Sequence, residues 1–162
     1  MHAAVMEYVG RYRTQAAVSV VEIGSRDING SVRPLFPAAT WVGIDLLPGP
    51  RVDIVGDATQ YRPDSQVDLV ICCEVLEHAP NWRELIAAAA GWLKQSGRLI
   101  VTCAAHNRRP HSGIDGSRKL KDGEHYAGVS CMELAREMQA AGLVITSMEH
   151  FQADTRGSGV KL

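Results

Sequence analysis

The strongest constraint on the fold is a series of short apolar runs, each separated from the next by a turn, a loop or a helical pattern. The runs are rich in Val, Ile and Leu, which is typical of strands buried on both faces of a parallel sheet. Six strands are predicted, at residues 17–23, 40–46, 51–55, 67–73, 98–104 and 143–151. This alternation predicts an α/β protein, a three-layer sandwich with a mostly parallel central sheet.

Helical periodicity predicts amphipathic helices at residues 2–14 and 81–94. Ser130 and Glu133 have capping-box spacing and predict a third helix that ends near residue 141. Residues 105–128 are polar and are expected to form a long loop. The whole chain, 1–162, is predicted to be one domain with its core at 16–151; the polar tail, 152–162, is expected to be frayed or to hold one short last strand.

Composition excludes several classes of protein. The formal net charge of −1 gives no general attraction for nucleic acid or for an anionic membrane. The four cysteines form no C-x-x-C pair, so we expect reduced thiols rather than a zinc site. The chain has no signal-peptide pattern and no apolar stretch of about 20 residues. These features predict a soluble, cytoplasmic protein without a membrane partner.

Acidic residues stand at the ends of four successive predicted strands. Glu22, Asp45, Asp57 and Glu74 each close or follow one of these strands. The carboxyl ends of parallel strands meet at one edge of a sheet, where such folds bind ligands. Carboxylates there suit the hydroxyl and amino groups of a nucleoside. Taken singly, Asp45 is equally well interpreted as a strand-end cap and Asp57 as a turn residue, so the prediction depends on the ordered set.

The segments VVEIGSRDING, WVGIDL, VDIVGDAT, VDLVICCEVLEHAPNW and GWLKQSGRLIVT follow one another in this order. Together they resemble the successive motifs of the class I S-adenosylmethionine (SAM)-dependent methyltransferases, of the type with "LEH" after the fourth strand. The resemblance covers about residues 18–151. It implies a Rossmann-like fold of the class I methyltransferase type, with SAM as cofactor and S-adenosylhomocysteine (SAH) as product. The short tail leaves open a shortened C-terminal hairpin.

The resemblance also implies roles for individual residues. The first loop would surround the methionine part of SAM, the acid after the second strand would bind the ribose hydroxyls, and the acid after the third strand would face the adenine amino group. The implied cofactor-binding residues are Glu22, Gly24, Ser25, Asp27, Asn29, Gly30, Asp45, Leu46, Asp57, Ala58, Cys73 and Glu74. The first loop departs from the family's G-x-G-x-G pattern, because its middle glycine is absent.

The segment after the fourth strand carries the candidate catalytic residues. Glu74, Glu77 and His78 are expected to lie beside the sulfonium, and His78 is the preferred general base because imidazole titrates near neutral pH. The alternative is that His78 only packs beneath the loop. The array also resembles the metal site of ubiquinone-pathway and small-RNA methyltransferases. A divalent ion held by Glu74, Glu77, His78 and His125 is therefore a further hypothesis, although no metal site is firmly predicted.

The acceptor is not identified by the sequence. We expect transfer of the methyl group to an oxygen or nitrogen of a small or acidic acceptor, or of an exposed group on a macromolecule. The basic loop favours an acidic acceptor, and its basic residues are His106, Arg108, Arg109, His111, Arg118, Lys119, Lys121 and His125. The alternatives are a non-catalytic SAM-fold module and a metal-assisted RNA methyltransferase. Because the leading prediction is a small or acidic acceptor, nucleic acid is not the expected partner. The chain is expected to be a monomer or a homodimer.

Overall fold

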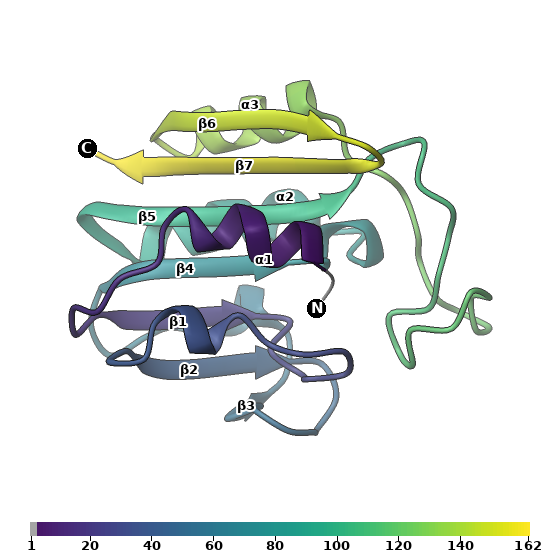
Figure 1. Cartoon of the computed structure of the whole chain (residues 1–162), viewed down its shortest axis with the longest axis horizontal. Helices are drawn as coiled ribbons and strands as arrows, with labels where there is room; N and C mark the ends of the chain where they lie inside the picture. Colours follow the sequence, from purple (N-terminus) through teal and green to yellow (C-terminus); the bar gives the residue numbers. More distant parts are fainter. Residues whose placement is uncertain (1–2) are drawn as a thin grey trace.

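A seven-stranded sheet forms the centre of the molecule (Figure 1), which a computed structural model describes for residues 3–162. Its strands are β1 (Ser19–Ile23), β2 (Thr40–Asp45), β3 (Ile54–Val55), β4 (Val67–Cys73), β5 (Leu93–Ala104), β6 (Leu143–Phe151) and β7 (Asp154–Lys161). The order across the sheet is β3-β2-β1-β4-β5-β7-β6. Strands β1 to β5 are parallel to one another, whereas β7 runs antiparallel to both β5 and β6. The predicted, mostly parallel α/β sandwich is confirmed.

Helices cover both faces of this sheet. Helix α1 (Ala3–Gly10) lies on one face, and α2 (Trp82–Trp92) and α3 (Cys131–Ala140) lie on the other (Figure 1). The capping box predicted for α3 is present, because Ser130 and Glu133 exchange hydrogen bonds between side chain and backbone. Helix α1 is shorter than the predicted segment 2–14, of which residue 2 lies outside the described residues.

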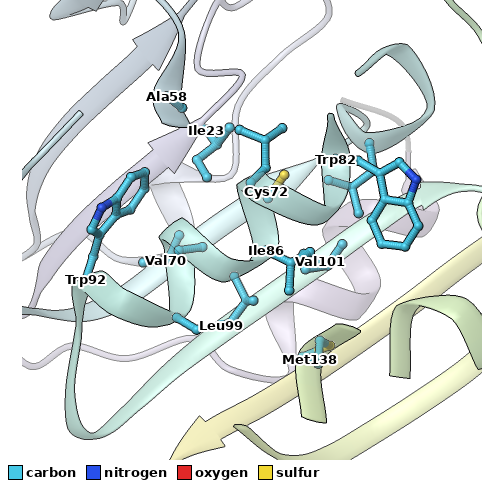
Figure 2. Close-up of a cluster of buried hydrophobic side chains, with 14 of the residues drawn as sticks. Ile23, Ala58, Val70, Cys72, Trp82, Ile86, Trp92, Leu99, Val101 and Met138 are labelled. Atoms are coloured by element: carbon cyan, nitrogen blue, oxygen red, sulfur yellow. The ribbon is translucent and has the colours of Figure 1, made fainter. Parts of the chain in front are cut away.

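Two hydrophobic clusters hold the layers together. On the α2–α3 side, Ile86 and Met138 pack over Val70 and Leu99 of the sheet (Figure 2). On the opposite side, the buried face of α1 packs against apolar residues of β1, β4 and β5. Burial of these large apolar side chains supplies most of the free energy that holds such a sandwich together.

The C-terminal tail contradicts the expectation of a frayed end. Strand β7 has eight residues, lies between β5 and β6, and completes the hairpin with β6, so the hairpin is not shortened. Its polar side chains are buried because they have partners: Thr155 donates a hydrogen bond to the Val129 carbonyl, and Arg156 pairs with Glu7 and Glu149.

The strand order places a site at one edge of the sheet. The chain runs outward from β1 to β2 and β3, and then returns to β4 on the other side of β1. Strands β1 and β4 are therefore the point at which the order reverses, where parallel sheets leave a crevice at their carboxyl ends. The third predicted strand, 51–55, is reduced to Ile54–Val55. No helix within residues 3–162 is both long and apolar enough to cross a bilayer.

Candidate active site

Two adjoining cavities lie at the carboxyl ends of β1 and β4. The larger has a volume of about 430 Å³ and is bordered by the loop after β1, the segment after β4 and residues 111–116. The smaller, of about 140 Å³, lies between the ends of β1, β2 and α2. Gly24, Val75 and His78 line both cavities. The two cavities are therefore neighbours at the crevice that the strand order creates.

The small cavity is lined by two acidic residues and by several apolar side chains. Asp45, at the end of β2, accepts hydrogen bonds from the backbone N–H groups of Arg26 (3.2 Å) and Leu47 (3.0 Å). Asp57 accepts from the N–H (2.9 Å) and hydroxyl (2.8 Å) of Thr59, and both bonds use Oδ1. Leu46 and Ala58 also line this cavity. All four cofactor-binding residues predicted in this region are therefore brought together.

The loop after β1 is closely packed against the segment after β4. Gly24 has a φ of 73°, and a Cβ there would lie 2.2 Å from Val75 Cγ2, so both the backbone and the packing require glycine. Gly30 also has positive φ, at 101°. Gly24, Asn29 and Gly30 line the large cavity, as do Cys73 and Glu74. The loop thus approaches the strand ends closely without the middle glycine of the common pattern.

Three other predicted cofactor-binding residues lie outside both cavities. Glu22 is buried and accepts a hydrogen bond from Arg33 Nε at 2.9 Å, although burial raises the pKa of its carboxyl. Asp27 accepts from the Gly30 N–H (2.7 Å) and from Arg51 (2.9 Å). Ser25 is buried beneath the loop. Their contacts indicate that Glu22, Ser25 and Asp27 stabilise the loop after β1. Direct contact of these residues with a cofactor stays a prediction.

Glu74 is the centre of a charged network at the end of β4. It adopts a φ of 60°, which is uncommon for a residue with a side chain. Its carboxylate accepts a hydrogen bond from the Thr102 hydroxyl (3.0 Å) and pairs with Arg108, which also contacts Asp154 at 3.0 Å. These contacts tie β4, β5, the long loop and β7 together. The network fixes the orientation of Glu74 at the edge of the large cavity.

Glu77 is completely buried beneath the site. Neither of its carboxylate oxygens has a hydrogen-bond partner among the described residues. Burial, reinforced by the negative charge of Glu74, raises the pKa of Glu77 to about 8. At neutral pH this side chain is therefore mainly a neutral carboxylic acid. An unpartnered buried polar group is costly, and in native proteins it commonly marks a functional site.

His78 stands between the two cavities and forms a cluster of three rings. Its ring centroid lies 5.0 Å from that of His111 and 5.3 Å from that of Tyr126, all in edge-to-face contact. Burial, with a contribution from His111, lowers the pKa of His78 to about 4. Its Nδ1 atom is buried and has no hydrogen-bond partner among the described residues. The imidazole is thus neutral at physiological pH and able to accept a proton.

One group of side chains has the composition of a metal site. Ligand atoms of Glu77, His78 and His111 all lie within 4.8 Å of one another. Of the residues named in the metal hypothesis, Glu77 and His78 belong to this group. His125 is exposed and is not part of it, and Glu74 is engaged by Arg108. The second histidine of this candidate metal group is therefore His111, and not His125 as the sequence had suggested.

The structure adds three residues to those predicted as a site. Arg26 and Arg108 line the large cavity together with His111. Arg108 and His111 lie in the basic loop, and their charge alone did not distinguish them from the other basic residues of that loop. Arg26 contacts backbone carbonyls of residues 113 and 114, which are far away in the chain. No local pattern could have shown this contact.

Comparison with known proteins agrees with this geometry. Residues 5–148 match the family described as methyltransferase domain. The chain is 34% identical over 102 residues to a ubiquinone biosynthesis O-methyltransferase from Xanthomonas euvesicatoria. That match covers 57% of the chain but only 41% of the relative. The chain therefore spans well under two thirds of this curated relative.

Solved methyltransferases share the fold. A SAM-dependent methyltransferase from Clostridium acetobutylicum superposes with a TM-score of 0.69 at 12% identity, covering 98% of this chain and 89% of that one. The 1,6-didemethyltoxoflavin-N1-methyltransferase of Burkholderia thailandensis, solved with its namesake compound and SAH, has a TM-score of 0.67 at 16% identity. This match covers 98% of this chain and 75% of that one.

The fold and the bipartite crevice define a class I methyltransferase domain. The family match extends over most of the chain, so the protein belongs to the class I SAM-dependent methyltransferase family.

Proposed function

We propose that this chain binds SAM across both cavities and transfers its methyl group to an oxygen or nitrogen of a small acceptor in the large cavity. The observation that carries the proposal is that the two cavities adjoin and share Gly24, Val75 and His78 in their walls. A nucleoside fits the apolar slot flanked by acids, and the remaining space is large enough for an amino-acid chain and a second molecule.

The small cavity is suited to the adenosine half. Backbone N–H groups of Arg26 and Leu47 orient the Asp45 carboxylate, which is therefore prepared to accept hydrogen bonds from two ribose hydroxyls. Asp57 uses only Oδ1 for its contacts with Thr59, which leaves Oδ2 as the acceptor for the adenine amino group. Apolar side chains between the two acids suit the faces of the purine.

The large cavity is suited to the methionine half and to the acceptor. Gly24 and Gly30 keep the loop free of bulk, so its backbone can approach the amino acid. SAM supplies an electrophilic methyl group on a positively charged sulfur. The protein aligns the acceptor with this group and excludes water, which are the main contributions required for a displacement.

His78 is the residue placed to receive a proton from the acceptor. It borders both cavities, its lowered pKa keeps it neutral at pH 7, and its Nδ1 has no partner among the described residues. A base with such a low pKa removes a proton only as the nucleophile gives up electrons to the methyl group, which matches a hydroxyl or an amine acceptor. The named relatives methylate oxygen in one case and nitrogen in the other.

Calorimetric titration with SAM and with SAH tests the proposal directly. We expect both ligands to bind with one site per chain at micromolar concentrations. If neither ligand binds at millimolar concentration, the enzyme proposal fails, and a non-catalytic module that keeps only the fold is the better description.

A metal-assisted transfer is the second candidate, and the unpartnered Glu77 oxygens favour it. Glu77, His78 and His111 would hold the ion, which would polarise an acceptor hydroxyl as a Lewis acid. Carboxylate and imidazole ligands suit Mn²⁺ or Zn²⁺.

Metal binding distinguishes the two candidates. If the second candidate is correct, Mn²⁺ binds stoichiometrically, and His111→Gln weakens its affinity by about tenfold or more, as expected for the loss of a ligand. His125→Gln is the matched control, because His125 is exposed and outside the group. Full transfer activity in the presence of a strong chelator, with no bound metal, would exclude this candidate and support the metal-free mechanism.

A further inference from the structure

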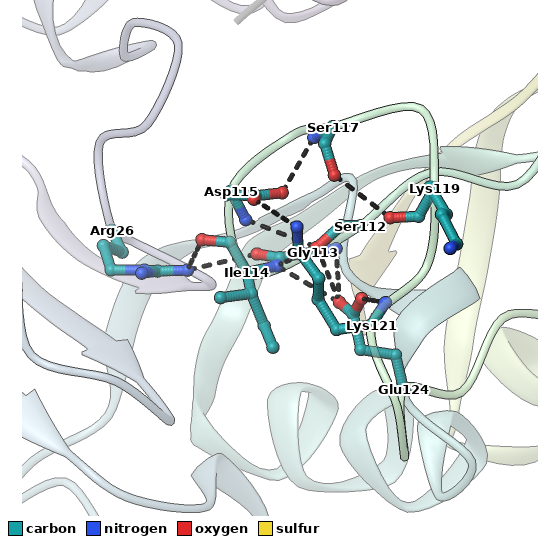
Figure 3. Close-up of polar contacts among 9 residues, drawn as sticks. All are labelled: Arg26, Ser112, Gly113, Ile114, Asp115, Ser117, Lys119, Lys121 and Glu124. Atoms are coloured by element: carbon teal, nitrogen blue, oxygen red, sulfur yellow. Dashed lines mark hydrogen bonds and ion pairs between the residues drawn. The ribbon is translucent and has the colours of Figure 1, made fainter.

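Residues 112–124, which we call the lid, form a folded unit rather than a loose loop. The Glu124 carboxylate accepts four hydrogen bonds, and three of them come from Ser112 Oγ (3.0 Å), Gly113 N (2.8 Å) and Ile114 N (3.2 Å). The fourth comes from the backbone N–H of Lys121 at 2.5 Å. Figure 3 shows Glu124 at the centre of these contacts. The two arms of the lid are thereby held together by one side chain.

The lid adds its own turn contacts to this arrangement. Asp115 pairs with Lys121 at 2.8 Å and accepts from the Ser117 N–H at 2.9 Å (Figure 3). Gly116 and Gly123 have φ values of 72° and 84°, so both turns use conformations that favour glycine. The lid is therefore able to move as one body if its attachment to the rest of the protein is released.

The lid borders the site on the side opposite the strand ends. Ser112, Gly113 and Gly116 line the large cavity. A Cβ at Gly113 would lie 3.1 Å from the His78 ring, and one at Gly116 would lie 3.0 Å from the Asn29 amide nitrogen. The lid thus rests directly on His78 and on the loop after β1.

The side chain of Arg26 joins the lid to the loop after β1 by direct hydrogen bonds. Arg26 Nη2 donates to the Gly113 carbonyl at 3.1 Å and to the Ile114 carbonyl at 2.8 Å (Figure 3). Its Nε lies 3.8 Å from Asp45 Oδ1, and its aliphatic part passes over Gly49. The same half-buried arginine therefore contacts the lid on one side and the acid of the small cavity on the other.

We propose that Arg26 is a latch that holds the lid closed over the large cavity and so retains the bound cofactor. The claim that the closed lid retains the cofactor rests on the proposed function. The claim that Arg26 holds the lid closed does not, because it concerns the protein without cofactor. Opening requires the guanidinium to leave two carbonyls, and charged donors make hydrogen bonds stronger than neutral ones. The Asp45 carboxylate, 3.8 Å from Arg26 Nε, attracts the guanidinium in the free protein.

Hydrogen–deuterium exchange in the free protein tests the latch. Arg26→Ala is expected to speed amide exchange in residues 112–117 by about tenfold or more, since opening then breaks no charged hydrogen bond. Arg26→Lys should give an intermediate rate, because an ammonium cannot span both carbonyls as a planar guanidinium does. Arg62→Ala is the matched control: Arg62 also donates to two backbone carbonyls, those of Thr59 and Tyr61, but lies away from the lid.

Dissociation of SAH tests the retention. In stopped-flow displacement, Arg26→Ala should release SAH about tenfold faster than the unaltered protein, and Arg62→Ala should not. Glu124→Gln provides a second route to the same effect, because it loosens the lid and leaves Arg26 intact. Unchanged lid exchange in Arg26→Ala overturns the latch, and faster exchange with unchanged SAH release overturns the retention. If the unaltered protein binds no SAH, the proposed function fails, while the exchange experiment still decides the latch.

Discussion

Replacing Asp45 by Asn is expected to weaken SAH binding by about 100-fold or more. Each hydrogen bond to a charged acceptor contributes ~1.5–3 kcal/mol, and a ribose offers two hydroxyls to this carboxylate. The asparagine side chain keeps one oxygen for the Leu47 N–H, but its NH₂ group replaces the oxygen that accepts from the Arg26 N–H and cannot accept a hydrogen bond from a ribose hydroxyl. The variant therefore removes the charge and one acceptor with little change in shape. Calorimetric titration with SAH measures the effect.

Asp64→Asn is the control for this experiment, because Asp64 is exposed and borders neither cavity. It should bind SAH as tightly as the unaltered protein. Equal affinity in Asp45→Asn would show that Asp45 is a strand-end cap rather than the ribose acceptor. Thermal unfolding of both variants verifies that the fold is retained.

Replacing Glu77 by Gln is expected to stabilise the fold, and increasingly so as the pH rises. Burial raises the pKa of Glu77 to about 8, well above its value in an unfolded chain. The folded state then holds a proton that the unfolded state has lost, so the free energy of unfolding falls between about pH 4.5 and pH 8. Glutamine resembles the neutral acid in shape but does not ionise, so the free energy of unfolding of the variant does not fall in this way. At ~1.4 kcal/mol for each unit of pKa difference, the gain at pH 9 should be at least ~2 kcal/mol.

Urea unfolding in chelator-containing buffer at pH 5 and at pH 9 measures this difference. Glu84→Gln is the matched control, because Glu84 is an exposed residue of α2. It should show nearly the same stability as the unaltered protein at both pH values. If the stability difference between Glu77→Gln and the unaltered protein is the same at pH 5 and at pH 9, Glu77 is not a buried neutral acid.

The parts of the site that the sequence predicted are those that follow directly from strand ends. The runs before Asp45 and before Glu74 are mainly apolar and predict buried strands, so the positions of their last residues follow from the pattern. Parallel strands then bring these acids to one edge. Asp57 follows the next strand and lines the small cavity for the same reason, although that strand is only two residues long; its contact with a cofactor stays a prediction.

A last strand was only one of two alternatives predicted for the tail, because the residues of β7 are polar and small. The sequence DTRGSGVK has no apolar alternation, and two glycines usually weaken a strand. Its burial depends on partners elsewhere, such as the Glu149 carboxylate for Arg156 and the Tyr12 hydroxyl for Ser158. Gly157 and Gly159 leave room for side chains packed above them, such as Met148 and Met138. These hydrogen-bond and packing partners of the polar residues and glycines of β7 are visible only in the folded structure.

The roles of Arg26 and His111 also depend on tertiary structure. Arg26 is one charged residue in a polar loop, and its partners lie 87 and 88 residues further along the chain. His111 and His125 are equivalent in sequence as loop histidines. The contacts of Glu124 fold the lid, and His111 lies against His78 while His125 is exposed. Loop geometry therefore decided between two residues that composition could not separate.

A crystal structure with SAH tests the proposed binding of the cofactor. We expect adenosine in the small cavity, with both ribose hydroxyls within hydrogen-bond distance of Asp45 and the sulfur beside Val75 and His78. The homocysteine chain should lie along the loop from Gly24 to Gly30. Adenosine in the large cavity, or a sulfur remote from His78, would show that the cofactor does not bind as proposed.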